Sequence, residues 1–101
     1  MKRLLIAATA ALMMAATHAD EVCAELGQYA RTVMESRQLG VPLSKVMAVV
    51  KDADIPKKIA LDAYEQPRFQ SEEFRQTAIE DFGNKWETLC YRVRSKKGTN
   101  V

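Results

Sequence analysis

The sequence has little of what acid–base or metal chemistry requires. Among 101 residues histidine occurs once, as His18, and cysteine occurs twice. The 15 basic residues exceed the 13 acidic ones by two, and Lys2 and Arg3 near the amino terminus account for that excess. Residues 20–101 therefore carry balanced charge and no histidine. This composition excludes a strongly basic nucleic-acid binder, a histidine-dependent hydrolase and a Cys/His zinc site.

Long apolar runs are also lacking. The longest, Leu4 to Ala16, has 13 residues, whereas a membrane-spanning helix needs about 20. Lys2 and Arg3 precede this run, and Thr17-His18-Ala19 follows it with small residues on both sides of His18. This layout is typical of a secretory signal peptide, as opposed to an uncleaved anchor or a core helix. We therefore expect residues 1–19 to be a signal peptide. Residues 20–101 then form one exported domain, periplasmic or extracellular, without a transmembrane segment.

Catalytic and nucleotide-binding motifs are missing. The sequence has no GxxxxGK[ST], GxGxxG or GxSxG pattern, and such motifs position phosphates or a nucleophile. Asp52-Ala53-Asp54 lacks the glycine and the terminal glutamate of a calcium loop. The acidic pairs Glu72-Glu73 and Glu80-Asp81 are adjacent on a helix, so their carboxylates do not face each other as a glycosidase requires. We therefore expect no enzyme, no cofactor and no metal site.

The two cysteines, Cys23 and Cys90, are expected to pair. An exported chain meets an oxidising compartment, and two cysteines allow only one intramolecular bond. That bond would close a loop of about 68 residues, which the chain-entropy model values at roughly 4 kcal/mol. The alternative is a reactive thiol, but the chain offers neither a CxxC motif nor a histidine partner beyond His18.

Helical spacing of apolar residues predicts four helices and no strand. Asp20 is expected to cap the first helix, which ends at Gly40. Pro42 opens the second, and Asp54 caps the third, which stops before Pro67. Ser71 caps the fourth, and residues 95–101 form a tail that we expect to fray. The predicted fold is all-α: a small orthogonal or bundle-like domain whose first and last helices are joined by the disulfide.

The longest apolar stripes lie on the first and last predicted helices. A face as broad as that of the last helix suits packing by several neighbours. Gly83 interrupts this helix and either splits it or permits close approach of another helix. The stripe residues are Val22, Leu26, Tyr29, Ala30, Val33 and Met34 in the first helix, and Phe74, Ala78, Ile79, Phe82, Trp86, Leu89, Cys90 and Val93 in the last.

Two groups of side chains are candidates for a partner surface. Leu61, Tyr64 and Phe69 would form an apolar patch if they converge; otherwise the third helix uses both faces as core. Tyr91 projects from the back of the fourth helix. Arg92 and Arg94, with Lys96 and Lys97, make a basic cluster for an anionic lipid or an acidic protein, or simply match the helix dipole.

Short stretches of the chain resemble a loose group of small exported helical proteins of proteobacteria and their phages. These stretches are the cysteine at the start, residues 37–43 (RQLGVPL), residues 63–67 (AYEQP), and Phe82 eight residues before Cys90. The resemblance implies a compact helical domain with one disulfide, and it transfers no catalytic residue.

The expected function is therefore that of a small exported, non-enzymatic binding or inhibitor-type protein of the bacterial envelope, such as an immunity or exclusion factor. Its expected partner is another envelope protein. A periplasmic chaperone or envelope-stress protein is the alternative. A small hydrolase that uses carboxylates is a third hypothesis, and it would need two carboxyl groups facing each other across a cleft.

Overall fold

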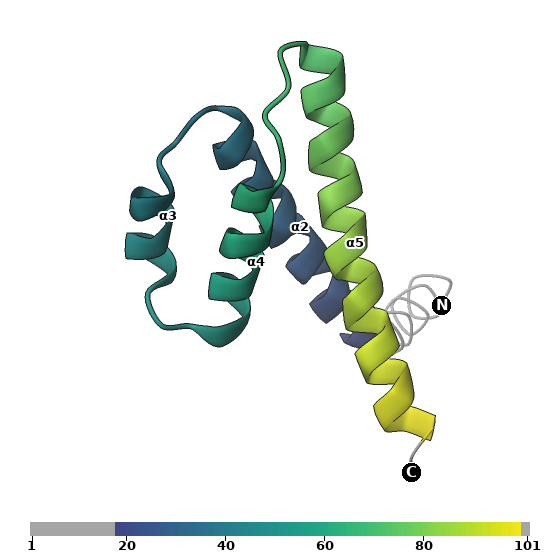
Figure 1. Ribbon diagram of the computed structural model, residues 1–101. Helices are drawn as coiled ribbons and strands as arrows, with labels where there is room; N and C mark the ends of the chain where they lie inside the picture. The colour runs from purple at the N-terminus through teal and green to yellow at the C-terminus, as the bar shows by residue number, and fades with distance from the viewer. Residues whose placement is uncertain (1–17, 100–101) are drawn as a thin grey trace, which may run out of the picture.

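The computed structural model describes the backbone of residues 18–99 and the side chains of residues 21–95. This part of the chain forms four helices and no strand, which confirms the all-α prediction (Figure 1). The helices are α2 (His18–Gln38), α3 (Leu43–Val50), α4 (Asp54–Glu65) and α5 (Glu72–Thr99). The expected signal segment lies outside the described residues except for His18 and Ala19, which begin α2.

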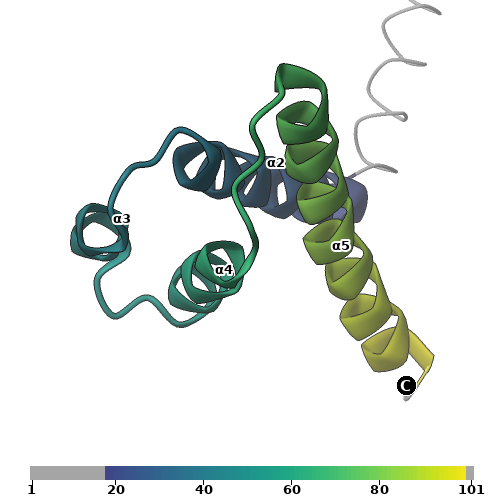
Figure 2. The same ribbon diagram turned by 45° about the horizontal axis from the view of Figure 1, so that its top comes forward.

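Helices α2 and α5 form an antiparallel pair, with α4 packed against α2 and α3 on the outer side of α4 (Figures 1 and 2). The two helices are antiparallel because residues further along α2 contact residues nearer the start of α5. Cys23 is bonded to Cys90, and Arg31 lies against Gly83. The structure thus confirms the expected disulfide between the first and last helices.

The core lies where α2, α4 and α5 meet. Each of these helices contributes apolar side chains at helical spacing, so that their apolar faces meet in one core. The buried cluster consists of Ala30, Val33 and Met34 from α2, Ile59, Ala60 and Ala63 from α4, and Ile79 and Phe82 from α5.

Two of the expected helix ends are confirmed. Gly40 has φ +84°, and the N–H groups of Gly40 and Val41 donate to the carbonyls of Arg37 and Ser36 at 3.1 and 3.0 Å. This is a Schellman motif, which favours glycine because an L side chain is strained at positive φ. At the start of α5, the Ser71 Oγ accepts a hydrogen bond from the Phe74 N–H at 3.2 Å.

Three expected helix ends differ from the structure. Helical backbone already begins at His18, so Asp20 does not cap α2. Asp54 is the first residue of α4, and Ala53 is its N-cap without a side-chain hydrogen bond. The carboxylate of Asp54 still lies at the positive end of the helix dipole, where it is favourable without capping. Helix α5 runs to Thr99 and so includes five residues of the tail that we expected to fray.

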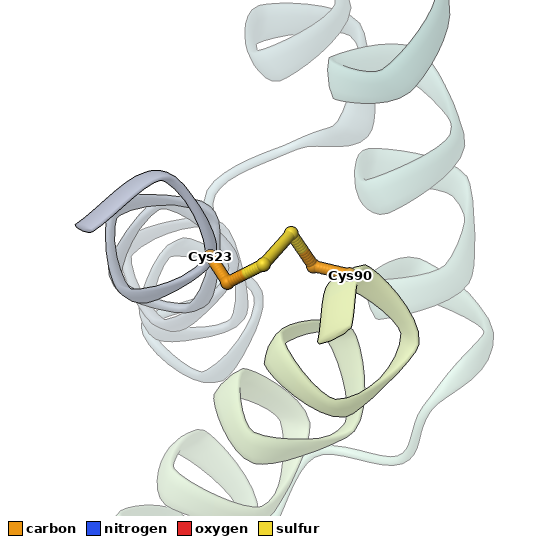
Figure 3. The surroundings of a disulfide bond; sticks show 2 residues. All are labelled: Cys23 and Cys90. Atoms are coloured by element: carbon orange, nitrogen blue, oxygen red, sulfur yellow. A yellow bond between two sulfur atoms is a disulfide. The ribbon is translucent and has the colours of Figure 1, made fainter. Parts of the chain in front are cut away.

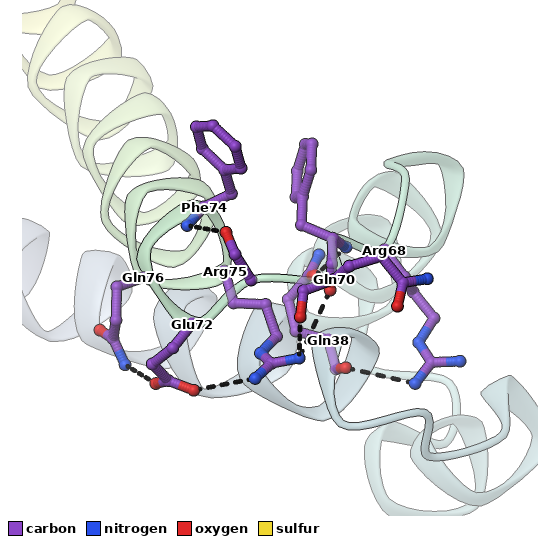
Figure 4. Close-up of polar contacts among 9 residues, drawn as sticks. Gln38, Arg68, Gln70, Glu72, Phe74, Arg75 and Gln76 are labelled. Atoms are coloured by element: carbon purple, nitrogen blue, oxygen red, sulfur yellow. Dashed lines mark hydrogen bonds and ion pairs between the residues drawn. The ribbon is translucent and has the colours of Figure 1, made fainter.

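The segment between α4 and α5 is held by Gln38, whose role the sequence did not indicate. Gln38 is only 3% exposed. Its Nε2 donates to the Pro67 carbonyl at 2.9 Å, and its Oε1 accepts from the Phe69 N–H at 2.9 Å. Figure 4 shows this amide beneath the segment that leads into α5. A buried amide that bonds the chain on both sides fixes the path between the two helices.

Candidate functional site

The six residues expected to form a partner surface do not make one patch. Leu61 is exposed on α4, whereas Tyr64 turns inward, donates its hydroxyl to the Val41 carbonyl at 2.5 Å and lies beside the Arg37 guanidinium. Tyr64 therefore packs against the core and does not join Leu61 in an exposed patch. Phe69 packs against Phe74 instead, with ring centroids 6.2 Å apart.

The remaining three of these residues, Tyr91, Arg92 and Arg94, are exposed on the last part of α5. Arg94 lines a larger feature there, which we call the apolar groove. The groove has a volume of about 970 Å³ and is open to solvent. Its walls are Val22, Glu25, Leu26 and Tyr29 from α2, Ile55 and Pro56 from α4, and Trp86, Leu89, Cys90, Val93 and Arg94 from α5.

The groove exists because α4 is too short to cover the α2–α5 pair. Helix α2 has 21 residues and α4 has 12. At 1.5 Å per residue α2 is about 31 Å long and α4 about 18 Å, which leaves about 13 Å uncovered. The carboxyl end of α4 lies beside that of α2, since Arg37 Nε donates to the Gln66 carbonyl at 3.0 Å. The uncovered length is therefore at the amino-terminal end of α2, and Figure 1 shows α5 continuing past α4.

The uncovered residues belong to the same apolar stripes that form the core. Val22, Leu89 and Val93 were expected to face the interior, but they are 41%, 38% and 55% exposed. Leu26, Tyr29 and Trp86 are partly buried at the junction between the core and the groove. The apolar stripes of α2 and α5 therefore extend beyond α4, the helix that buries them in the core.

The disulfide holds the two walls of the groove together. Cys23 is fully buried, and its Cα lies 5.4 Å from that of Cys90, which lines the groove (Figure 3). A covalent bond at this position fixes the spacing of α2 and α5 where α4 no longer contacts them.

Trp86 is held in place by α4. Its indole Nε1 donates to Asp62 Oδ2 at 3.0 Å, and the same oxygen accepts from Lys85 Nζ at 2.8 Å. Lys85 thus reaches from α5 to α4, where it shares one carboxylate oxygen with the indole.

Charged groups occur on both long walls of the groove. Glu25 lies on the α2 wall and Arg94 on the α5 wall, and both are exposed. Partial burial raises the pKa of Tyr29 above its usual value. Among the side chains that the structure describes, the groove thus combines an apolar floor with one acid and one base at its rim.

Two of the acidic residues considered for catalysis are paired with arginines, Glu80 with Arg31 of α2 and Glu72 with Arg75 of its own helix. The Arg75 guanidinium lies 3.0 Å from Glu72 and holds the pKa of that carboxyl below its usual range, and Gln76 also donates to it (Figure 4). A general acid needs the opposite shift. Within the described residues no group of three His, Cys, Asp or Glu side chains is placed to hold a metal ion. No helix among them is long and apolar enough to cross a membrane.

Sequence reasoning identified the stripes but missed the groove. The available signal was the difference in helix length, since the third predicted helix is much shorter than the first and the fourth. Comparison with protein-family models, curated proteins and solved structures finds no match for this chain.

Proposed function

We propose that this chain is a small exported, non-enzymatic binding or inhibitor-type protein of the bacterial envelope, and that it engages an envelope protein through the apolar groove. The observation that carries the proposal is a groove of about 970 Å³ whose exposed floor continues the core. Contiguous exposed apolar surface rimmed by polar groups is typical of a protein-binding site. The disulfide supports the proposal because a rigid surface loses less entropy when it binds.

A matched pair of leucines tests the proposal. Leu89 lies in the groove and is 38% exposed, whereas Leu61 lies outside it on α4 and is 42% exposed. Leu89→Lys and Leu61→Lys therefore make the same chemical change at similar exposure. The full chain would be expressed with its own amino-terminal segment, isolated from the periplasm and cross-linked to envelope extract.

We expect wild type and Leu61→Lys to cross-link to the same envelope protein, and Leu89→Lys to lose it. Equal recovery by all three chains, or no recovered protein, would contradict the proposal. Mass spectrometry of the periplasmic product should give a chain that begins at Asp20. A product that remains in the cytosol with residues 1–19 attached would contradict export.

A periplasmic chaperone is the second candidate, because the same exposed side chains could bind unfolded chains. It predicts that the protein suppresses aggregation of unrelated denatured clients, and that Leu89→Lys weakens this suppression. Absence of suppression at neutral and acidic pH would remove this candidate.

A further inference from the structure

We infer that the occupant of the apolar groove is a short amphipathic helix of the partner protein, with a basic side chain for Glu25 and an acidic one for Arg94. This inference rests on the proposed function and names the element that the groove recognises.

Helix α4 already occupies the continuation of the groove. Ile59, Ala60 and Ala63 of α4 are buried against α2 and α5, while Ile55 and Pro56 in its first turn form the end of the groove. The uncovered stretch of about 13 Å corresponds to two to three helical turns. A second helix placed in line with α4 would therefore bury the remaining part of both stripes with the same packing geometry.

The walls favour a helix over an extended segment. Both long walls are helices, and helices satisfy their own backbone hydrogen bonds along their length. An extended peptide gains its affinity chiefly from main-chain bonds to an exposed sheet edge, which these walls do not provide. A bound helix makes its backbone hydrogen bonds internally, and it presents an apolar stripe at positions i, i+3, i+4 and i+7.

The rim charges specify the polar flanks of that helix. Glu25 stands on the α2 wall and Arg94 on the α5 wall. An occupant lying between them meets an acid on one side and a base on the other. A stripe flanked by Lys or Arg towards α2 and by Asp or Glu towards α5 is complementary, and the reversed arrangement is repelled on both sides.

Two other occupants fit less well. A second copy of this chain would place one concave groove against another and leave both unfilled. Among the described residues that line the groove, a lipid would find one cation, Arg94, for its head group, with Glu25 on the opposite wall. Both alternatives remain outcomes of the experiment.

Trp86 supplies the readout. It is the chain's single tryptophan and it lines the groove, so its fluorescence reports occupancy when the probe contains no tryptophan. The probe is a synthetic peptide of about 15 residues. A cross-link between two of its own side chains holds it as a helix, because free helices of that length are marginally stable. Its leucines follow the helical stripe, with lysines on one flank and glutamates on the other. A second peptide of identical composition has alternating leucines, and a third has the two charged flanks exchanged.

We expect the helical peptide to change Trp86 emission saturably and to bind about tenfold more tightly than the alternating peptide. Leu89→Lys should weaken it by about tenfold, as for loss of a central anchor, whereas Leu61→Lys should leave its affinity unchanged. Val93→Lys provides a second groove variant at a more exposed position. Glu25→Lys should weaken the first peptide and strengthen the exchanged one, each by about two- to fivefold, as expected for a rim charge.

Equal binding of the helical and alternating peptides, or no saturable change in Trp86 emission with either, would overturn the inference that the occupant is a helix. Sedimentation that shows a wild-type dimer, dissociated by Leu89→Lys, would assign the groove to a second copy. A saturable Trp86 change with phosphatidylglycerol vesicles that displaces the peptide would assign it to lipid. If Leu89→Lys abolishes cross-linking to the envelope protein while the helical peptide fails to bind, the proposed function stands and this inference falls.

Discussion

The side chain of Arg31 in α2 crosses directly over Gly83 in α5, where an added Cβ would overlap the Arg31 Cγ. The relationship is reciprocal, because Glu87 of α5 lies over Gly27 of α2 in the same way. The Arg31 guanidinium then reaches Glu80 at 3.4 Å and Glu87 at 3.6 Å, and donates to Asn84 Oδ1 at 2.7 Å. In each helix, a glycine thus leaves the space that a charged side chain of the other helix occupies.

Gly83→Ala should destabilise the protein even though alanine is the better helix former. The gain in helix propensity is about 1 kcal/mol, whereas displacing the Arg31 stem costs about 1–3 kcal/mol, as for overpacking. Urea denaturation measures the difference. In an Arg31→Ala background the same substitution should become neutral or stabilising, which forms a double-mutant cycle. An increase in stability from Gly83→Ala in the wild-type chain would contradict this account.

Gly27→Ala is the companion substitution, and urea denaturation should show little change or a small gain in stability, because the helix-propensity gain of about 1 kcal/mol applies here too. The atom nearest its new Cβ is the carboxylate oxygen of Glu87, at the far end of a flexible side chain. That end can move at the expense of one partly exposed ion pair, worth about 0–1 kcal/mol.

Reduction of Cys23–Cys90 should lower the free energy of unfolding by about 4 kcal/mol, because the bond closes nearly the whole domain. Thermal melts with and without reductant measure the loss. The double variant Cys23→Ser/Cys90→Ser should melt near the reduced wild type and should not respond to reductant. A reduced protein that melts with the oxidised one would show that the bond does not constrain the unfolded chain.

Gln38→Leu should cost about 1–3 kcal/mol, because it leaves the Phe69 N–H and the Pro67 carbonyl without their buried partner. Hydrogen exchange at the Phe69 amide, measured by NMR, should accelerate more than exchange in the middle of α2. Ser36→Ala, on the same helix but partly exposed, provides a control. Unchanged protection at Phe69 would show that the amide does not hold this segment.

Tyr64→Phe should cost about 0.5–1.5 kcal/mol below pH 10, through loss of the hydrogen bond to the Val41 carbonyl. Burial raises the pKa of Tyr64, and the Arg37 guanidinium only partly opposes it. Because the folded-state pKa lies above the unfolded value of about 10, the contribution is complete below that pH and is lost as the pH rises through the folded-state pKa.

Chemical denaturation between pH 8 and about 11.5, a range chosen to span the tyrosine titration, should therefore show the wild-type advantage over Tyr64→Phe declining. Taking the difference between wild type and Tyr64→Phe cancels the contribution of Tyr29, which both proteins share. A constant difference across this range would contradict the linkage.

Local signals in the sequence were sufficient for the helices and the disulfide. Apolar residues at helical spacing, Gly40, Pro42 and Ser71 placed the helices to within a few residues, because caps and breakers act on their own neighbours in the chain. The pairing of Cys23 with Cys90 followed because there is no other cysteine. Misplaced ends, such as Asp20 and Asp54, were errors at helix termini, where acidic residues are favourable at more than one position.

Only the tertiary structure decided which part of each apolar stripe is buried. Val33 and Val22 lie on the same face of α2, yet one is in the core and the other lines the groove, because α4 extends over the first and stops short of the second. The tertiary structure also decided the polar partners of Gln38, Tyr64 and Lys85, because these partners lie on other segments of the chain. Periodicity indicates which face of a helix is apolar, but the packing of a third helix against two others determines how much of that face remains exposed.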